Sequence, residues 1–207
     1  MRRLAALVGA AVMAVYTDIT WSAAASESVT IRANHTIAED GVPLLLSGTV
    51  SNGQPGEGVT IEQDDCGPIP WHPLRTVRTG QGGGWVSYAG GDQNFRLRAR
   101  WRGTVSKTIR IGVRPELTLA GVSGSLRVII RAYDWFGGKT AQLQRARATR
   151  WETVATANLA KRGSAGQYAQ TWGTFTQKVG HGVYRAVLPN ASAAPCYVAG
   201  FSATLRL

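Results

Sequence analysis

Cysteine, histidine and acidic residues are all scarce in this chain of 207 residues. Two cysteines and three histidines leave little for a zinc site or a dense disulfide scaffold. Only 12 Asp+Glu stand against 23 Lys+Arg, which gives a net charge of +11. The 25 glycines follow no Gly-X-Y period, which excludes collagen. Hydrophobic residues nevertheless make up 44% of the chain, so general disorder is excluded and a packed core is expected.

The first 25 residues have the layout of a secretory signal peptide. Arg2 and Arg3 supply the positive start, residues 4–16 are apolar, and small residues at 23–25 precede a cleavage site before Ser26. The apolar run is shorter than the roughly 20 residues that a transmembrane helix needs. We therefore expect a mature protein without a transmembrane segment, either secreted to the extracellular space or held at the cell surface. The alternative is an uncleaved membrane anchor.

From residue 26 onward, short runs of alternating apolar and polar residues are separated by turns rich in glycine and proline, which predicts an all-β sandwich. The first half contains seven such runs, at residues 28–33, 44–50, 59–63, 74–78, 85–88, 95–101 and 105–113. The second half also contains seven, at residues 117–120, 126–133, 141–147, 151–159, 167–172, 182–188 and 198–207. We predict two tandem seven-stranded domains, over residues 26–114 and 115–207, joined by a short junction that Pro115 stiffens.

The two halves also match in detail. Three features recur in both: a block in the third strand (59–63 and 141–145), a tryptophan before or at the fourth (Trp71 and Trp151), and an Arg-Ala ending near the sixth (Arg98-Ala99 and Arg185-Ala186). This arrangement resembles the tandem immunoglobulin-like or fibronectin-type-III-like repeats of secreted actinobacterial proteins. The 19 arginines against 4 lysines also fit a high-GC bacterium. The resemblance implies immunoglobulin-like β-sandwiches without the paired cysteines of antibody domains, and such folds host many unrelated functions.

Cys66 and Cys196 fall in different halves, so neither closes a disulfide within its own domain. Strands of a sandwich mostly alternate in direction, so loops after odd-numbered strands lie at the end where the domain's chain exits. Cys66 follows the third predicted strand of the first half, whereas Cys196 follows the sixth of the second half. Cys66 is therefore expected at the exit end of the first domain and Cys196 at the entry end of the second domain, and these two ends face each other across Pro115. We therefore predict an interdomain disulfide, permitted by an oxidising compartment; the alternatives are two free thiols or an intermolecular pair.

Acidic residues of the first half gather in loops predicted to face the second half, namely Glu39, Asp40, Asp64, Asp65 and Asp92. Opposing segments carry Lys139, Lys161 and Arg162, with Trp135-Phe136 as apolar filling. We predict that these charges support a fixed junction. Two other interpretations are solvated loop tips, since exposed ion pairs contribute only about 0–1 kcal/mol, and a calcium site, although no Asp-x-Asp-x-Asp-Gly spacing occurs.

No catalytic motif is found along the chain. The segment 121–124 (Gly-Val-Ser-Gly) lacks the Gly-x-Ser-x-Gly spacing of a nucleophile elbow. His35, His72 and His181 lie in or beside different predicted loops, without a His-Glu-x-x-His pair. We expect no enzymatic activity, no cofactor and no metal. A small β-sandwich enzyme with a scattered triad is the alternative.

Positive charge is concentrated in the second half. Residues 26–114 carry 10 Lys+Arg and 8 Asp+Glu, whereas residues 115–207 carry 11 and 3. Four basic residues fall in predicted loops at the free end of the second domain, away from the junction: Arg145, Arg147, Arg150 and Lys178. A field of one sign concentrates anions, so we predict contact with an anionic cell-envelope polymer or acidic glycan. Nucleic acid is a poor physiological partner for an exported protein, and no reading motif is present.

Two tryptophans suggest a rival function. Trp101 ends a predicted strand beside Arg100 and Arg102, and Trp135 lies in a predicted loop, so either is a candidate platform for stacking on a sugar. The rival to anion binding is thus a carbohydrate-binding module, and the third possibility is a purely structural spacer. Salt separates the first two, because ionic strength weakens binding through charges.

Overall fold

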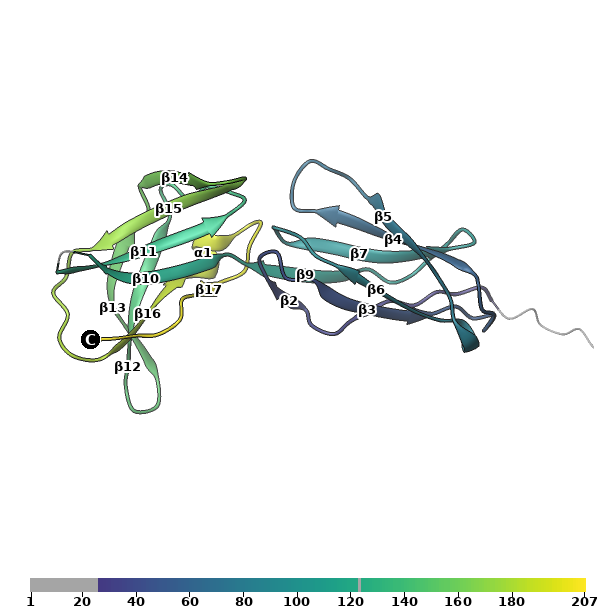
Figure 1. The fold of residues 1–207 in the computed structure, drawn as a ribbon, viewed down its shortest axis with the longest axis horizontal. Helices are drawn as coiled ribbons and strands as arrows, with labels where there is room; N and C mark the ends of the chain where they lie inside the picture. The colour runs from purple at the N-terminus through teal and green to yellow at the C-terminus, as the bar shows by residue number, and fades with distance from the viewer. Residues whose placement is uncertain (1–25, 123) are drawn as a thin grey trace, which may run out of the picture.

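The computed structural model describes residues 26–122 and 124–207, and the predicted signal peptide lies outside the described residues. Strands dominate these residues, and the only α-helix among them is the single turn α1 (Asn190–Ala193). Figure 1 shows two bodies in line along the long axis, one built from β1–β9 and the other from β10–β18. We call these the first and the second sandwich.

The first sandwich consists of two sheets. One has the order β1-β3-β6, formed by β1 (Arg32–Ala33), β3 (Leu44–Thr49) and β6 (Gly84–Ala89). The other has the order β2-β9-β7-β4-β5, formed by β2 (Ile37–Glu39), β9 (Ile109–Arg114), β7 (Phe95–Trp101), β4 (Gly58–Asp65) and β5 (His72–Arg78), with β8 (Thr104–Val105) paired to β7. All of these pairs are antiparallel except β2 with β9, which run parallel.

The second sandwich also has two sheets. One has the order β10-β11-β15-β14, formed by β10 (Glu116–Val122), β11 (Ser125–Ala132), β15 (Tyr168–Phe175) and β14 (Lys161–Ala165). The other has the order β13-β12-β16-β17, formed by β13 (Trp151–Asn158), β12 (Thr140–Ala146), β16 (Val183–Leu188) and β17 (Gly200–Phe201), with β18 (Leu205–Arg206) paired to β16. Every strand pair of this sandwich is antiparallel.

The strand order is that of an immunoglobulin-like sandwich. In the second sandwich, β10, β11, β15 and β14 take the places of strands A, B, E and D, while β12, β16 and β17 take those of C, F and G. The first sandwich follows the same plan, with β1, β3 and β6 as A, B and E facing the sheet that contains β4, β7 and β9. The predicted all-β, immunoglobulin-like fold is confirmed.

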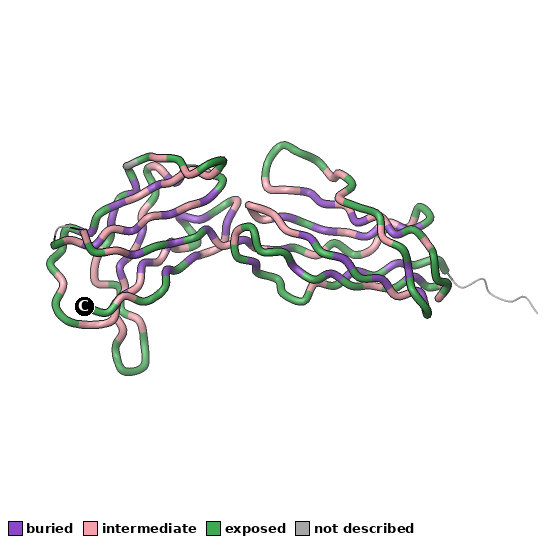
Figure 2. The backbone as a smooth tube through the Cα atoms, in the orientation of Figure 1, coloured by how far each residue is buried: buried purple, intermediate pink, exposed green. Residues whose placement is uncertain are grey.

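Strand alternation explains which side chains form the core. Along β7, Phe95, Leu97, Ala99 and Trp101 are buried while arginines occupy the positions between them. The same period of two buries alternate residues of β11 and β16. Figure 2 shows buried and exposed segments alternating along the strands of both sandwiches. Because the outward positions of β7 and β16 carry arginine, each sandwich presents guanidinium groups on one sheet surface.

Four features of the strand plan differ from the prediction. The structure adds β2 and β14, and it breaks the predicted strand 105–113 into β8 and β9 and the predicted strand 198–207 into β17 and β18. Residues 161–165 (Lys-Arg-Gly-Ser-Ala) have no apolar alternation, so only their pairing with β15 makes them a strand. β2 is three residues long and buries only Ala38. Such short edge strands depend on a neighbouring strand, which local patterning does not reveal.

Candidate functional site: the interdomain junction and the basic surface

Cys66 and Cys196 form a disulfide between the two sandwiches, with a Cα–Cα distance of 5.3 Å and a sequence separation of 130. Cys66 directly follows β4, and Cys196 lies between α1 and β17. The predicted pairing is therefore confirmed, and the two alternatives of free thiols or an intermolecular bond do not hold in this structure. The bond fixes the end of the first sandwich to the facing end of the second.

Asn94 reinforces the disulfide with four hydrogen bonds. Its backbone N–H donates to the carbonyl of Cys196 at 2.8 Å, and its backbone carbonyl accepts from the N–H of Cys66 at 2.8 Å. Its side-chain Nδ2 donates to the carbonyl of Pro195 at 3.0 Å, while Oδ1 accepts from the N–H of Val113 at 2.8 Å. Asn94 thus links the disulfide, β9 and the β16–β17 connection, and no sequence motif marked it.

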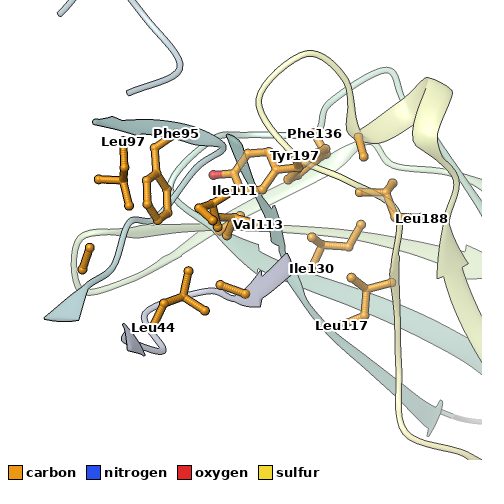
Figure 3. Close-up of a cluster of buried hydrophobic side chains, with 14 of the residues drawn as sticks. Leu44, Phe95, Leu97, Ile111, Val113, Leu117, Ile130, Phe136, Leu188 and Tyr197 are labelled. Atoms are coloured by element: carbon orange, nitrogen blue, oxygen red, sulfur yellow. The ribbon is translucent and has the colours of Figure 1, made fainter. Parts of the chain in front are cut away.

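The junction also contains a continuous apolar cluster. Figure 3 shows Phe95, Ile111 and Val113 of the first sandwich beside Tyr197 and Phe136 of the second. The rings of Phe136 and Tyr197 are 5.3 Å apart, and Tyr197 is only 3% exposed. The Tyr197 hydroxyl accepts a hydrogen bond from the N–H of Asp134 at 3.3 Å, and burial raises the pKa of this hydroxyl. Phe136 therefore packs in the apolar cluster at the junction, as predicted.

The five acidic residues predicted at the junction do not act as one group. Glu39 pairs with Arg114 at 3.2 Å, while Asp64 pairs with Arg96 and Asp65 accepts a hydrogen bond from Gln63, all within the first sandwich. Asp40 and Asp92 alone among the five face the second sandwich: Tyr168 donates a hydrogen bond to Asp92 at 3.4 Å, and Arg131, which pairs with Glu116, acts on Asp40 only through its charge. Lys139 and Arg162 form no ion pair with them in the described part of the chain, and the side chain of Lys161 lies outside it.

The calcium interpretation finds no support in the placement of these carboxylates. No cluster of three or more His, Cys, Asp or Glu side chains arranged to hold a metal ion occurs among residues 26–122 and 124–207. Asp64 and Asp65 were predicted in a loop, but β4 continues through both because they pair with Arg96 and Phe95 of β7. This extension places the buried Asp64 opposite Arg96, with which it forms an ion pair.

Asp40 is the carboxyl at the junction whose ionisation is most perturbed. Both of its side-chain oxygens are buried without a hydrogen-bond partner among the described residues. Burial, followed by the nearby charge of Asp92, raises the pKa of Asp40 from 3.8 to about 6, while Arg131 opposes the shift and Glu116 adds to it. The folded protein therefore binds a proton between about pH 4 and pH 6 that the unfolded chain does not bind.

We expect the Asp40→Asn variant to lose part of the pH dependence of stability. Because the folded pKa is raised, the contribution of Asp40 to the free energy of unfolding is most favourable below about pH 4 and is lost as the pH rises through about 6. The variant should gain stability over the parent protein at pH 7.5 and lose that advantage at pH 4.5. Urea unfolding of both proteins at the two pH values measures this difference. An equal difference at both values would contradict it.

The predicted basic residues of the second sandwich occupy two neighbouring loops. Arg145, Arg147 and Arg150 lie on the β12–β13 hairpin, whose tip projects sideways from the second sandwich, across the long axis, in Figure 1. Nη2 of Arg145 donates to the carbonyl of His181 at 2.6 Å, which joins the hairpin to the β15–β16 loop that carries Lys178. Arg147, Arg150 and Lys178 are exposed, while Arg145 is half-buried.

One carboxylate on the hairpin reduces this positive charge. Glu152 accepts a hydrogen bond from Nε of Arg147 at 2.6 Å, and Arg147 holds the pKa of Glu152 below its ordinary value. Glu152 was not among the residues predicted for this surface, although it lies five residues from Arg147 across a hairpin turn. Arg145, Arg150 and Lys178 have no ion-pair partner within the described residues, so they retain the net charge of this surface.

The two candidate tryptophans differ sharply in exposure. Trp101 is 1% exposed, and its indole N–H donates to Glu57 at 3.0 Å, so the prediction that it forms a stacking platform is wrong. Its position is in phase with Phe95, Leu97 and Ala99 on β7, which explains its burial. Trp135 is 47% exposed in the loop before β12, with the Arg162 guanidinium 5.3 Å from its ring. It remains available for stacking.

Two Trp–Arg stacks are further candidate sites, formed by residues that were predicted only as features of the internal repeat. The Arg98 guanidinium lies 4.2 Å from the ring centroid of Trp71, and the Arg185 guanidinium lies 4.2 Å from that of Trp151. In the first sandwich the arginine lies on β7 and the tryptophan lies just before β5. In the second sandwich the arginine lies on β16, the equivalent of β7, and the tryptophan is the first residue of β13, the equivalent of β5. The 80-residue spacing of the tryptophans was the signal for this equivalence.

Comparisons with known proteins support no functional assignment. No family model and no curated protein matches the sequence. Among solved structures, the crystal structure of bovine butyrophilin is similar over 88% of this chain and 99% of that chain, with a TM-score of 0.38 and 10% sequence identity. A likeness this distant adds nothing on function, and the immunoglobulin-like assignment rests on strand order. In the described part of the chain, no helix has the length and apolarity to cross a membrane.

Proposed function

We propose that this protein is an exported, non-enzymatic binding protein whose second sandwich contacts anionic polymers of the cell envelope or extracellular space. The immunoglobulin-like fold is compatible with a binding or structural role. The disulfide is compatible with the oxidising environment outside the cytoplasm. Export itself rests on the signal peptide predicted at residues 1–25. The division into domains 26–114 and 115–207 is part of the proposal.

The observation that carries the proposal is the unbalanced charge of the second sandwich. Its three carboxylates all have partners: Glu116 pairs with Arg131, Glu152 with Arg147, and Asp134 accepts from Gln93 at 2.6 Å. Eleven basic residues share this half of the chain, so most of its positive charge is left without an internal counter-charge. By contrast, six of the eight arginine–carboxylate ion pairs between described residues lie in the first sandwich.

The test is retention of residues 26–207 on resin carrying teichoic acid, compared with resin carrying neutral dextran. Retention on the anionic resin should fall steeply between about 0.05 M and 0.5 M NaCl, where the Debye length shrinks to roughly 4 Å. The Arg150→Ala/Lys178→Ala variant should bind roughly 2- to 30-fold more weakly at low salt, because each exposed ion pair contributes about 0.2–1 kcal/mol. Both side chains are exposed, so the fold should be unaffected.

A matched control removes two exposed arginines from the first sandwich. Arg32→Ala/Arg75→Ala loses the same net charge on residues that are also exposed. If the two double variants weaken retention equally, net charge rather than the second sandwich explains binding. Salt-resistant retention on dextran that is lost in Trp135→Ala would establish the carbohydrate-binding alternative. Retention on neither resin would leave the structural spacer.

A further inference from the structure

The two sandwiches differ at one equivalent position on their outer sheet surface. In the first, Glu62 of β4 accepts hydrogen bonds from Nε of Arg98 at 2.5 Å and from Nε of Arg100 at 2.7 Å. In the second, the residue in this place is Gln144 of β12, whose amide oxygen accepts from Nε and Nη2 of Arg185 at 3.0 and 2.8 Å. Glu62 is the cross-strand neighbour of Arg98, as Gln144 is of Arg185. A carboxylate is therefore replaced by a neutral amide.

Arg185 consequently carries a charge that nothing in its surroundings neutralises. It forms no ion pair with any described residue, and its Nη1 has no hydrogen-bond partner among them. Its guanidinium lies over Trp151 and 5.4 Å from the ring of Phe201, and burial lowers its pKa. A partly desolvated guanidinium with free N–H groups is a strong site for a planar oxyanion.

Apart from Arg114, whose guanidinium lies 4.7 Å from the centroid of the Phe201 ring and pairs with Glu39 at 3.2 Å, the side chains that contact Arg185 are neutral. Thr153 donates to Gln142 at 3.3 Å and accepts from Gln144 at 3.5 Å, forming a strip of amides and a hydroxyl across β12 and β13. Phe201 is 47% exposed on the other side of Arg185. Amide and hydroxyl groups suit sugar hydroxyls, and an exposed ring suits the apolar face of a pyranose.

We propose that the surface formed by Trp151, Gln144, Arg185 and Phe201 binds hexuronic acid units of an acidic polysaccharide. The sugar carboxylate binds the N–H groups of Arg185 that Gln144 leaves free, and it supplies the negative charge that Glu62 supplies in the first sandwich. The pyranose ring packs on Phe201, and its hydroxyls contact the amides of β12. Arg114 beside Phe201 is already paired with Glu39, so Arg185 is the one cation of this surface without a paired carboxylate, which fits one carboxylate per sugar better than the contiguous charges of a polyphosphate. The inference rests on the proposed function in so far as the ligand is an anionic polymer.

The first experiment is calorimetric titration of residues 26–207 with short oligogalacturonate, with its methyl ester and with polyphosphate. We expect saturable binding of the free acid and at least about tenfold weaker binding of the ester, because the ester loses a charge-assisted hydrogen bond. Polyphosphate should not compete for the site. Equal affinity for acid and ester, or displacement by polyphosphate, would overturn the assignment of this surface to uronic acids.

The decisive variant is Gln144→Glu, which supplies an internal carboxylate to Arg185 with almost no change in side-chain volume. It should weaken oligogalacturonate binding by about tenfold or more, as a neutralised Arg185 no longer attracts the ligand. The matched control is Gln167→Glu, which makes the same charge change at an exposed residue between β14 and β15, on the other sheet. The control should alter affinity less than about twofold; equal weakening by both variants would overturn the proposal.

The Arg150→Ala/Lys178→Ala variant separates this inference from the proposed function. It should reduce retention on teichoic acid while leaving oligogalacturonate affinity within about twofold. If oligogalacturonate does not bind but salt-sensitive retention on teichoic acid persists, the uronic acid site is wrong and the anionic-polymer function stands. If oligogalacturonate binds and teichoic acid does not, the site stands and the broader function fails.

Discussion

Replacing both Cys66 and Cys196 with serine should lower the free energy of unfolding by up to about 5 kcal/mol, which is the chain-entropy value for a loop of this length. The bond closes most of the described chain into one loop, so its loss gives the unfolded state far more freedom. Asn94 and the apolar contacts around Tyr197 remain in the variant. We therefore expect weakened coupling between the sandwiches rather than loss of either fold.

Urea unfolding monitored by tryptophan fluorescence measures this effect. The chain contains only two cysteines, so a reducing agent acts on a single bond. Reduction of the parent protein should reproduce the midpoint of the double serine variant, and the variant itself should not respond to reductant. A parent protein with the same midpoint before and after complete reduction would show that the junction is held by packing and hydrogen bonds alone.

Replacing Trp101 with alanine should destabilise the protein by about 3–5 kcal/mol, the range for removal of a large buried aromatic side chain. Trp101 is among the largest fully buried side chains, packed in the core of the first sandwich. Its indole N–H also donates to Glu57, and this hydrogen bond is the largest cause that lowers the pKa of that carboxylate. The substitution therefore leaves a cavity and removes one partner of Glu57.

Trp135→Ala is the matched control for Trp101→Ala. Because the Trp135 side chain is nearly half exposed, its removal should change the free energy of unfolding by no more than about 0.5 kcal/mol. Thermal or urea unfolding of the two variants compares them directly. If Trp101→Ala were as stable as Trp135→Ala, the burial of Trp101 would be contradicted, and its role as an exposed stacking platform would have to be considered again.

The sequence predicted the disulfide correctly but the exposure of Trp101 wrongly. The disulfide was predictable because strand direction alternates along the chain, and this alternation places Cys66 and Cys196 at facing ends. The exposure of Trp101 was predicted wrongly because its arginine neighbours suggested a surface. The alternation of Phe95, Leu97 and Ala99 contained the correct signal, since Trp101 falls in the same phase.

The acidic residues show why loop positions were harder to predict than strands. Glu39, Asp64 and Asp65 were expected at the junction, but their partners are side chains of the first sandwich. Asp64 belongs to β4 because it pairs with Arg96 of β7, a residue far along the chain. Asp40 and Asp92 do face the second sandwich, where Tyr168 donates to Asp92 and the charge of Arg131 acts on Asp40. Cross-strand pairing decided these positions.

The sequence by itself determined the fold class, most of the strands, the repeat and the disulfide, because period-two alternation and strand direction are local properties of the chain. Only the tertiary structure decided which cations are neutralised. Glu62 neutralises Arg98 and Arg100, Glu152 pairs with Arg147, and Arg185 has only the amide of Gln144. An ion pair requires two side chains on the same face in register, and strand pairing sets that register.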